Sequence, residues 1–144
     1  MSAGIPGMDT DGGGQYRAVS HGIAVTVTPC FLGNQSDPGN ARFVWSYKVD
    51  IENMSNRPVR LRSRFWRITD ACGHIEEISG TGVVGDQPLI GPGECYSYTS
   101  GTPLETPSGI MEGYYLMEVE GEGMIKVAIP PFSLDSPHQA ATLH

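Results

Sequence analysis

The chain has 144 residues, with 19 glycines, 11 prolines and only 17% charged residues, against about 25% charged residues in a typical domain. This composition excludes helical bundles and coiled coils, which need long stretches of Ala, Glu, Lys, Leu and Arg, and it lacks the high charge typical of disordered chains. The net charge of −7 repels phosphate backbones and argues against nucleic-acid binding. No apolar run approaches the roughly 20 residues that span a bilayer.

The two ends of the chain differ from its middle. Residues 1–15 contain five glycines and little to bury, so we expect a flexible leader without the basic and apolar regions of a signal peptide. Residues 135–144 are expected to form a second flexible tail. The body, residues 16–134, shows no repeat and no linker, which predicts one domain. The three cysteines are too few and too widely spaced for a disulfide framework. We therefore expect a cytoplasmic protein with reduced and mostly buried thiols.

Large apolar side chains recur at every second residue of the body, which is the period of a strand with one buried face. The pattern covers five runs, at residues 23–28, 43–52, 59–65, 111–119 and 125–129. In the third run it slips at Trp66–Ile68, which predicts a β-bulge there.

Short turn signals separate these runs. They are Asn56–Pro58, Asp70–Gly73, Gly91–Gly93 and Glu120–Gly123. Together they indicate seven or eight strands in an all-β, antiparallel two-sheet sandwich of immunoglobulin or fibronectin type III kind. A β-barrel is the alternative architecture.

One glycine-rich segment, residues 80–85, matches the pattern GxGxxG through Gly80, Gly82 and Gly85. In a dinucleotide-binding fold this pattern needs a following helix. Here the chain continues with Asp86, Pro88 and Gly91–Gly93, which favour a turn or loop instead. The motif predicts glycines needed for backbone shape, with an oxyanion-binding loop of exposed amides as the alternative.

Five of the nine basic residues fall between positions 57 and 67. Alternation places Arg60, Arg62 and Arg64 on one face of a strand, as a candidate patch for an anion or an acidic partner. The competing interpretation is a ladder of ion pairs with Glu118, Glu120 and Glu122, which alternate in the same way on a later strand.

Other polar clusters offer weaker candidates. The trio Asp70, Cys72 and His74 has too few ligands for a closed zinc site, so no metal and no cofactor are expected. Glu76 and Glu77 would point to opposite faces of a strand and could not act on one substrate. No set of acid, base and nucleophile emerges, which predicts a protein without enzymatic activity.

Tyrosines are dense in the second half of the chain. Tyr96 and Tyr98 share a face, together with Tyr114 and Tyr115 nearby. The first interpretation places them at the edge of the core. If they were exposed near the arginines, Tyr96 and Tyr98 would form part of a surface that binds a protein partner.

The ordered set of motifs over residues 17–134 resembles the bacterial ApaG proteins, or DUF525 domain. The resemblance starts at Asn34–Pro38 and continues through Phe43–Asn53 and Arg64–Asp70. Its most specific block is Gly80–Pro88. The set then runs through Pro92–Glu94, Tyr96, Tyr98, Ser100–Gly101, Leu104, Thr106, Gly109, Met111, Gly113 and Tyr115 to Ile129–Leu134.

The resemblance implies a fold similar to fibronectin type III sandwiches, and no catalytic residues. It also implies an association with diadenosine tetraphosphate metabolism, through a neighbouring gene, and with cobalt and magnesium efflux. Related domains in eukaryotic proteins look like protein-interaction modules.

We therefore expect a non-enzymatic module that binds a protein partner through Arg60, Arg62, Arg64, Tyr96 and Tyr98 or through a sheet edge. A homodimer formed by edge strands would be consistent with this. The alternative is a sensor that weakly binds pyrophosphate or a nucleoside polyphosphate at Gly80, Gly82 and Gly85, with the arginines supplying charge.

Overall fold

The computed structural model describes residues 14–138, which form an antiparallel β-sandwich. Nine strands and two single-turn 3-10 helices, Gly33–Gln35 and Pro38–Asn40, make up the regular structure of this part. The strands are β1 (Tyr16–Ser20), β2 (Ile23–Phe31), β3 (Phe43–Asn53), β4 (Val59–Asp70), β5 (Ile75–Thr81), β6 (Leu89–Ile90), β7 (Cys95–Leu104), β8 (Gly109–Val119) and β9 (Gly123–Leu134). The two-residue strand β6 takes the number beyond the seven or eight expected.

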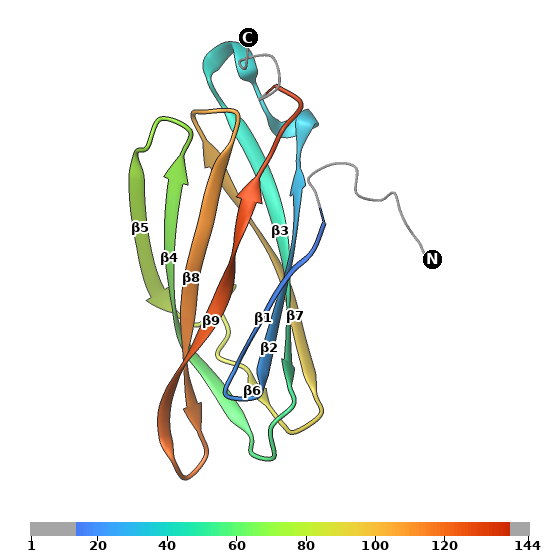
Figure 1. Ribbon diagram of the computed structural model, residues 1–144, viewed down its shortest axis with the longest axis vertical. Coiled ribbons are helices and arrows are strands. Elements are labelled where there is room, and N and C mark those ends of the chain that lie inside the picture. Colours follow the sequence, from blue (N-terminus) through green and yellow to red (C-terminus); the bar gives the residue numbers. More distant parts are fainter. Residues whose placement is uncertain (1–13, 139–144) are drawn as a thin grey trace, which may run out of the picture.

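The strands form two sheets, as the alternating pattern predicted (Figure 1). The first sheet has the order β1-β2-β3-β7, and the second has the order β5-β4-β8-β9. The short strand β6 continues along the same edge of β4 that β5 occupies, because it pairs with Val59 and Arg60 while β5 pairs with residues 63–69. Every pairing is antiparallel.

Aromatic side chains join the two sheets across the core. Tyr47 of the first sheet packs edge-on against Trp66 of the second, with ring centroids 5.3 Å apart, and Phe132 contacts both rings. Tyr47, Trp66 and Phe132 are all buried. Burial of one such side chain stabilises the fold by about 1.5–3 kcal/mol, so this cluster fixes the spacing of the sheets in the middle of the sandwich.

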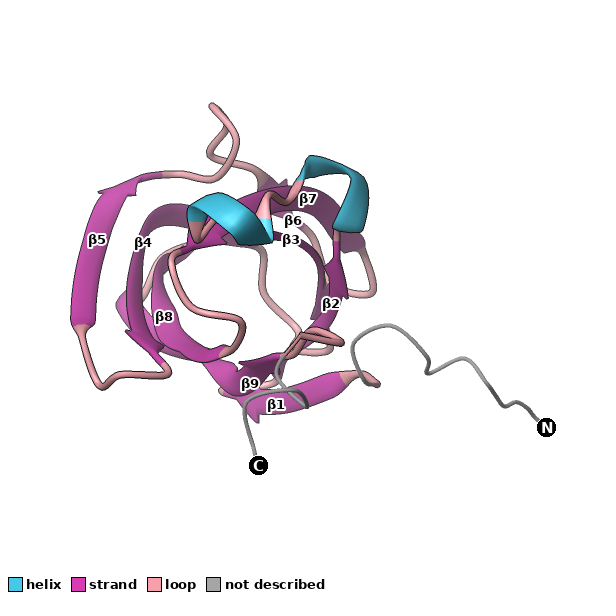
Figure 2. Cartoon of the chain, turned by 90° about the horizontal axis from the view of Figure 1, so that it is seen from above, coloured by secondary structure: helices cyan, strands magenta, loops and turns pink. Residues whose placement is uncertain are grey.

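The two long sides of the sandwich are unlike each other (Figure 2). On one side β1 and β2 lie against β9, and the Ala128 N–H donates a hydrogen bond to Ser20 Oγ at 3.0 Å. On the other side β7 ends the first sheet and β5 ends the second, and no strand of the described chain lies beside either outer edge. We call this second side the open side.

A β-bulge interrupts β4, but at a different place from the one predicted. Leu61 pairs with Met117 of β8 and Ser63 pairs with Leu116, so Arg62 is the extra residue. No register shift occurs at Trp66–Ile68, so that prediction is wrong. Because one added residue exchanges the two faces of a strand, Trp66 lies in the core with Leu61, while Phe65 faces outward and stacks on Tyr114.

Two further predictions, on the cysteines and on membrane-spanning segments, can be compared with the structure. The thiols are not mostly buried: Cys72 and Cys95 are exposed and Cys30 is half-buried. Cys72 sits in the turn between β4 and β5, and Cys30 lies on the outer face of β2. The described part of the chain contains no helix that is long and apolar enough to cross a bilayer.

The expected flexible segments fall largely beyond the described residues. Residues 1–13 and 139–144 lie outside this part of the chain. The start of the predicted tail lies against the body, because Trp45 Nε1 donates a hydrogen bond to the Asp135 carbonyl oxygen at 2.8 Å and the His138 ring contacts Phe31 and Phe43.

A tight turn at Val83–Asp86 joins β5 to the segment that leads into β6. Val83 and Asp86 exchange two backbone hydrogen bonds of 2.8 and 2.9 Å. The two central residues, Val84 and Gly85, have positive φ values of 42° and 82°, which is the signature of a type I′ turn. This backbone suits Asn-Gly and strains a β-branched residue. Val84 is also 58% exposed.

We expect Val84→Asn to raise the free energy of unfolding by about 1 kcal/mol, because Asn tolerates the left-handed backbone that strains valine. The melting temperature should rise by about 3 °C. Urea and thermal unfolding of the two proteins measure the change. Ile110→Asn is the matched control, since it also removes an exposed apolar side chain but from a strand. Equal stabilisation by both substitutions would contradict strain as the cause.

Candidate functional site

A polar cleft opens between the sheets on the open side and surrounds Arg64. Its volume is about 280 Å³. The first sheet contributes Tyr47, Tyr98 and Ser100, the second contributes Arg64, Trp66 and Thr81, and the turn contributes Val83, Val84 and Gly85. We call it the Arg64 cleft. The Arg62 bulge creates it, because the exchanged faces of β4 point Arg64 inward beside the core.

The Arg64 guanidinium is held by backbone oxygens. Its Nη1 donates to the Thr81 carbonyl at 3.1 Å and to the Gly82 carbonyl at 2.7 Å. Within residues 14–138 no carboxylate lies within 4 Å of the group, and no acceptor is found for Nε or Nη2. A half-buried cation without a counter-charge is unfavourable, so the cleft favours anions.

Three phenol hydroxyls lie close to this cation. Burial raises the pKa of Tyr98 and of Tyr115 well above the usual value, and the Arg64 charge acts in the opposite direction on both. Burial likewise raises the pKa of Tyr47, while the Ser100 hydroxyl beside it and Arg64 oppose that shift. The Tyr98 and Tyr115 hydroxyls are hydrogen-bonded to each other. All three phenols are therefore neutral donors at physiological pH.

The glycines of the GxGxxG segment serve the shape of this cleft. A Cβ atom on Gly80 would lie 2.8 Å from Arg64 Nη2 and 2.9 Å from Cζ, because the guanidinium lies flat over this residue. A Cβ atom on Gly82 would lie 2.2 Å from the Asp86 carbonyl oxygen. Strand and turn, with no helix, follow the motif.

Two amides at the start of the turn, those of Gly82 and Val83, are engaged. Val83 N–H and Asp86 N–H close the turn, and Gly82 N–H donates to the Arg62 carbonyl at 2.8 Å. The carbonyl groups of Thr81 and Gly82, and not a ring of amides, face Arg64.

The three arginines of the predicted patch do not share a face. Arg64 points into its cleft, whereas Arg62 pairs with Glu118 at 2.7 Å on the outer face and also donates to Gln87 Oε1. Arg60 donates to the Gln87 carbonyl at 2.9 Å. The predicted single patch is therefore wrong, and its physical reason is the bulge at Arg62.

The predicted ladder of ion pairs forms in part. Besides Arg62 with Glu118, Arg57 pairs with Glu122 at 2.9 Å. The side chain of Glu120 has no such partner among the described residues, although its carbonyl accepts a hydrogen bond from Arg57.

The two candidate tyrosines of β7 belong to the interior side of the first sheet. Tyr98 is buried. Tyr96 is half-buried, packs against the core and lies beside Asp86. Their placement agrees with the core-edge interpretation, so Tyr98 offers no exposed surface to a partner.

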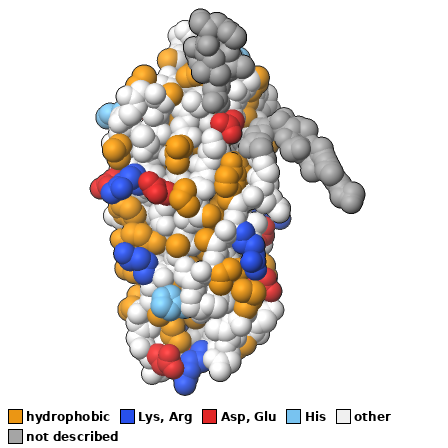
Figure 3. Space-filling model, in the orientation of Figure 1, with side chains coloured by type: hydrophobic (Ala, Val, Ile, Leu, Met, Phe, Trp, Pro, Cys, Tyr) orange, Lys and Arg blue, Asp and Glu red, His pale blue; other side chains and the backbone are white. Residues whose placement is uncertain are grey.

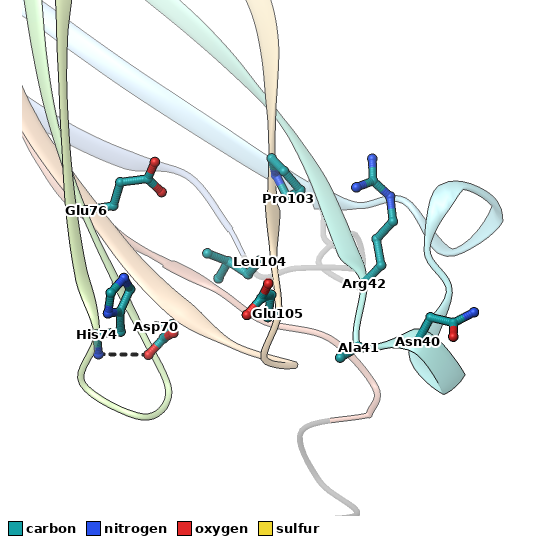
Figure 4. Close-up of a pocket in the computed structure, with 9 residues that line it drawn as sticks. All are labelled: Asn40, Ala41, Arg42, Asp70, His74, Glu76, Pro103, Leu104 and Glu105. Atoms are coloured by element: carbon teal, nitrogen blue, oxygen red, sulfur yellow. Dashed lines mark hydrogen bonds between the residues drawn. The ribbon is translucent and has the colours of Figure 1, made fainter.

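A second, larger cleft of about 550 Å³ lies at the other end of the open side (Figure 4). Glu76 and His74 line one wall, and Arg42 and Glu105 line the other parts. The carboxylate of Asp70 is occupied by the turn, because it accepts the N–H groups of Cys72 and His74, each at 2.9 Å.

The other polar candidates have structural partners. Glu77 pairs with Arg67 at 2.8 Å on the outer face while Glu76 lines the second cleft, so the two carboxylates point apart as expected. No group of three or more His, Cys, Asp or Glu side chains within residues 14–138 is arranged to hold a metal ion.

The face seen in Figure 3 carries hydrophobic side chains mixed with charged ones. Ile75, Ile110 and Met124 of the second sheet are each about half exposed. The ion pairs of Arg62 and Arg67 lie on the strands of the same sheet, and the pair of Arg57 with Glu122 lies in the loops at its end. These pairs neutralise Arg62, Arg67, Glu77 and Glu118 on the strands of this sheet.

The outer edge of β7 presents unpaired backbone groups. Asn53 N–H donates to the Glu94 carbonyl, so odd-numbered residues of β3 bond toward β7, and Met54 N–H donates to the Gly22 carbonyl, so even-numbered residues bond toward β2. Because the register of β3 with β7 is continuous, every second residue of β7 turns its backbone groups outward. These residues are Cys95, Ser97, Thr99, Gly101 and Pro103.

Sequence reasoning did not identify this edge or most of the cleft. It missed Tyr47, Trp66, Ser100 and Tyr115 as neighbours of Arg64, since they come from different strands. One signal was available, because Pro103 lacks an N–H group and prolines within a sheet favour edge strands.

Three comparisons with known proteins agree with one another. The family model of the ApaG domain (DUF525) matches residues 33–119. The chain is 54% identical to Protein ApaG of Rhizobium meliloti over 129 residues, which are 90% of this chain and 99% of that protein. It is 53% identical to Protein ApaG of Paramagnetospirillum magneticum, with the same coverage.

Solved structures give the same result. The crystal structure of the putative ApaA protein from Bordetella pertussis aligns with a TM-score of 0.78 and 41% identity, covering 85% of this chain and 98% of that one. The C-terminal domain of Wzt aligns with a TM-score of 0.52 and 11% identity, covering 84% of this chain and 77% of that domain, and it shares the fold alone.

The tyrosines of the cleft predict a loss of stability at alkaline pH. Their pKa values are raised in the folded protein, so they stabilise it fully below the pKa of an unfolded tyrosine, about 10. Above that pH the unfolded chain ionises first. The free energy of unfolding should then fall by about 1.4 kcal/mol per pH unit for each such tyrosine.

Urea unfolding at several pH values from 9 upward measures this slope. Tyr98→Phe should make the slope shallower by the contribution of one phenol. An alkaline slope that is identical in Tyr98→Phe and the parent protein would contradict the assignment.

Proposed function

The chain belongs to the ApaG family, and we propose that it is a non-enzymatic protein-interaction module that binds an extended segment of a partner along the outer edge of β7. Such binding adds a strand to the first sheet. The main-chain hydrogen bonds of the new strand supply affinity, and side chains at the edge supply selectivity.

The observation that carries this proposal is the unpaired edge of β7. The strand has ten residues and no charged side chain among them. Proteins commonly protect long edges with lysine, bulges or a covering segment. β7 has one proline, at Pro103, and within residues 14–138 no strand pairs with the outward N–H groups of Ser97, Thr99 and Gly101.

The chemistry of the clefts supports a binding role more than a catalytic one. The titratable groups around Arg64 are phenols with raised pKa values, which supply neither a base nor a nucleophile near neutral pH. In the second cleft, the Asp70 carboxylate already accepts two backbone hydrogen bonds.

The alternative function is a sensor of pyrophosphate or nucleoside polyphosphate. Of the three arginines expected to supply positive charge for it, only the Arg64 side chain lies at the glycine-rich segment. Arg60 and Arg62 are engaged elsewhere, and the Gly82 and Val83 amides are already bonded. A chain of phosphates would meet one free cation there, so the interaction module is the better-supported proposal.

Peptide selection tests the edge directly. Random peptides displayed on phage are selected on the immobilised protein, and binders are measured with Thr99→Pro. This substitution removes an outward N–H group that makes no bond to β3, so the fold should persist while affinity falls about tenfold or more, as expected for one lost main-chain hydrogen bond and a blocked edge.

Two controls make the result specific. Thr99→Val keeps the N–H group and should keep binding. Hydrogen exchange should show the amides of Ser97, Thr99 and Gly101 protected only in the complex, or in a dimer if a second copy occupies the edge. Peptides that bind Thr99→Pro with unchanged affinity, or that protect other amides, would refute the proposal.

A further inference from the structure

We propose that the Arg64 cleft is a binding site for one small oxyanion, a phosphate or carboxylate group, held by the free Nε–Nη2 edge of Arg64 and by the hydroxyl groups around it. This site is separate from the edge of β7. It would bind its ligand through a charged side chain and hydroxyl groups, whereas the edge would bind a peptide through main-chain hydrogen bonds.

The free donors of Arg64 are the first argument. A guanidinium carries five N–H groups, and the contacts to Thr81 and Gly82 both come from Nη1. The donors on Nε and Nη2 lie parallel in the group's plane and match the two oxygens of an oxyanion. Gly80 meets the face of the guanidinium and not its Nε–Nη2 edge.

The position of the guanidinium is fixed before any ligand arrives. Two backbone carbonyl groups hold Nη1, and the absence of a side chain at Gly80 provides the surface against which the group lies. Side-chain freedom that is already lost in the free protein need not be lost on binding. A preorganised cation in a partly buried cleft attracts an anion more strongly than a mobile surface arginine does.

Hydroxyl groups complete the set of donors. Tyr47 and Ser100 lie opposite each other on β3 and β7 and both line the cleft. Arg64 lines the same cleft, and Tyr47 stays protonated because burial raises its pKa. A neutral hydroxyl group can donate a hydrogen bond to an anion without adding a negative charge that would repel it.

The volume limits the ligand. At about 280 Å³ the cleft lies below the range of roughly 300–1,000 Å³ found for drug-sized ligands. It therefore fits a single phosphate or carboxylate group and not an enclosed nucleotide. Asp86 stands beside Tyr96 near the same turn, and its negative charge would repel the further charges of a polyphosphate.

Titration with inorganic phosphate and, separately, with sodium acetate tests the site. The readout is the NMR signal of the Arg64 Nε–H group in the full-length protein at low ionic strength, where screening is weak. We expect a saturable shift of this signal with at least one of the two anions, and the arm that binds more tightly identifies phosphate or carboxylate as the ligand class. No saturable shift with either anion would overturn the proposal.

Variants locate the binding. Arg64→Gln should weaken it about tenfold or more, as expected for loss of charged hydrogen bonds, while Arg62→Gln, which removes a similar charge on the outer face, should not. Arg64→Lys keeps the positive charge but lacks the two parallel N–H donors of the guanidinium, so it should bind the anion less tightly. Gly80→Ala, which displaces the guanidinium, should act like Arg64→Gln. Binding to the folded Arg64 variants is monitored by the NMR shifts of backbone amides. An affinity equal to that of the parent protein would also overturn the proposal.

Thr99→Pro separates this site from the proposed function. It blocks the edge of β7 without touching the lining of the cleft, so it should bind the anion as the parent protein does. Thr99→Pro is therefore expected to lose peptide binding and to keep anion binding. Peptide binding that persists would contradict only the proposed function, and anion binding that is absent in the parent protein would contradict only the anion site.

Discussion

The extra residue in β4 is the constraint on which both candidate sites depend. Without the bulge at Arg62, strict alternation would carry Leu61, Ser63 and Phe65 into the core and would leave Arg64 outside with Arg60 and Arg62. With it, Trp66 enters the core and packs on Tyr47, and Arg64 enters beside it. The same register shift thus has two effects on the free energy of folding. Burial of Trp66 stabilises the fold, and burial of the Arg64 cation destabilises it.

The cost of the inward arginine explains the glycine-rich segment. A guanidinium beside the core requires acceptors, and the nearest are backbone carbonyl groups of the strand paired with β4. For those groups to reach Arg64, the chain must pass close to it and then turn sharply. A side chain at Gly80 would displace the guanidinium, and one at Gly82 would clash with the Asp86 backbone. The motif GxGxxG therefore arises here from packing around an arginine. In a phosphate-binding fold the same sequence motif serves a different purpose, because its glycines let the backbone N–H groups of a helix N-terminus approach the phosphate.

The architecture was accessible from the sequence because period-two alternation is a local signal. Residues 45–51 alternate without interruption, and β3 has the predicted buried face, with Val44 buried in addition at its start. The cleft was less accessible because its walls come from β3, β4, β5 and β7, and a bulge exchanges faces without leaving a clear mark. Ser63 was the available clue, since a polar residue at a predicted core position suggests that the phase changes before it. The prediction instead placed the slip at Trp66–Ile68, after the aromatic residues, and so placed Arg64 on the wrong face.

Several local rules are broken on the open side, although His21 in the turn between β1 and β2 also has a positive φ, of 53°. Val84 has a backbone that valine disfavours, Arg64 is a cation without a counter-charge among the described residues, and β7 is a long edge without charged side chains. On the other side of the sandwich β1 and β9 close the gap and a backbone-to-serine hydrogen bond bridges them. Natural sequences are consistent across local and global levels except where function opposes stability. Strain, an unpaired cation and an unprotected edge each have a separate cause, so their occurrence on one side of the fold points to that side as the one that meets other molecules.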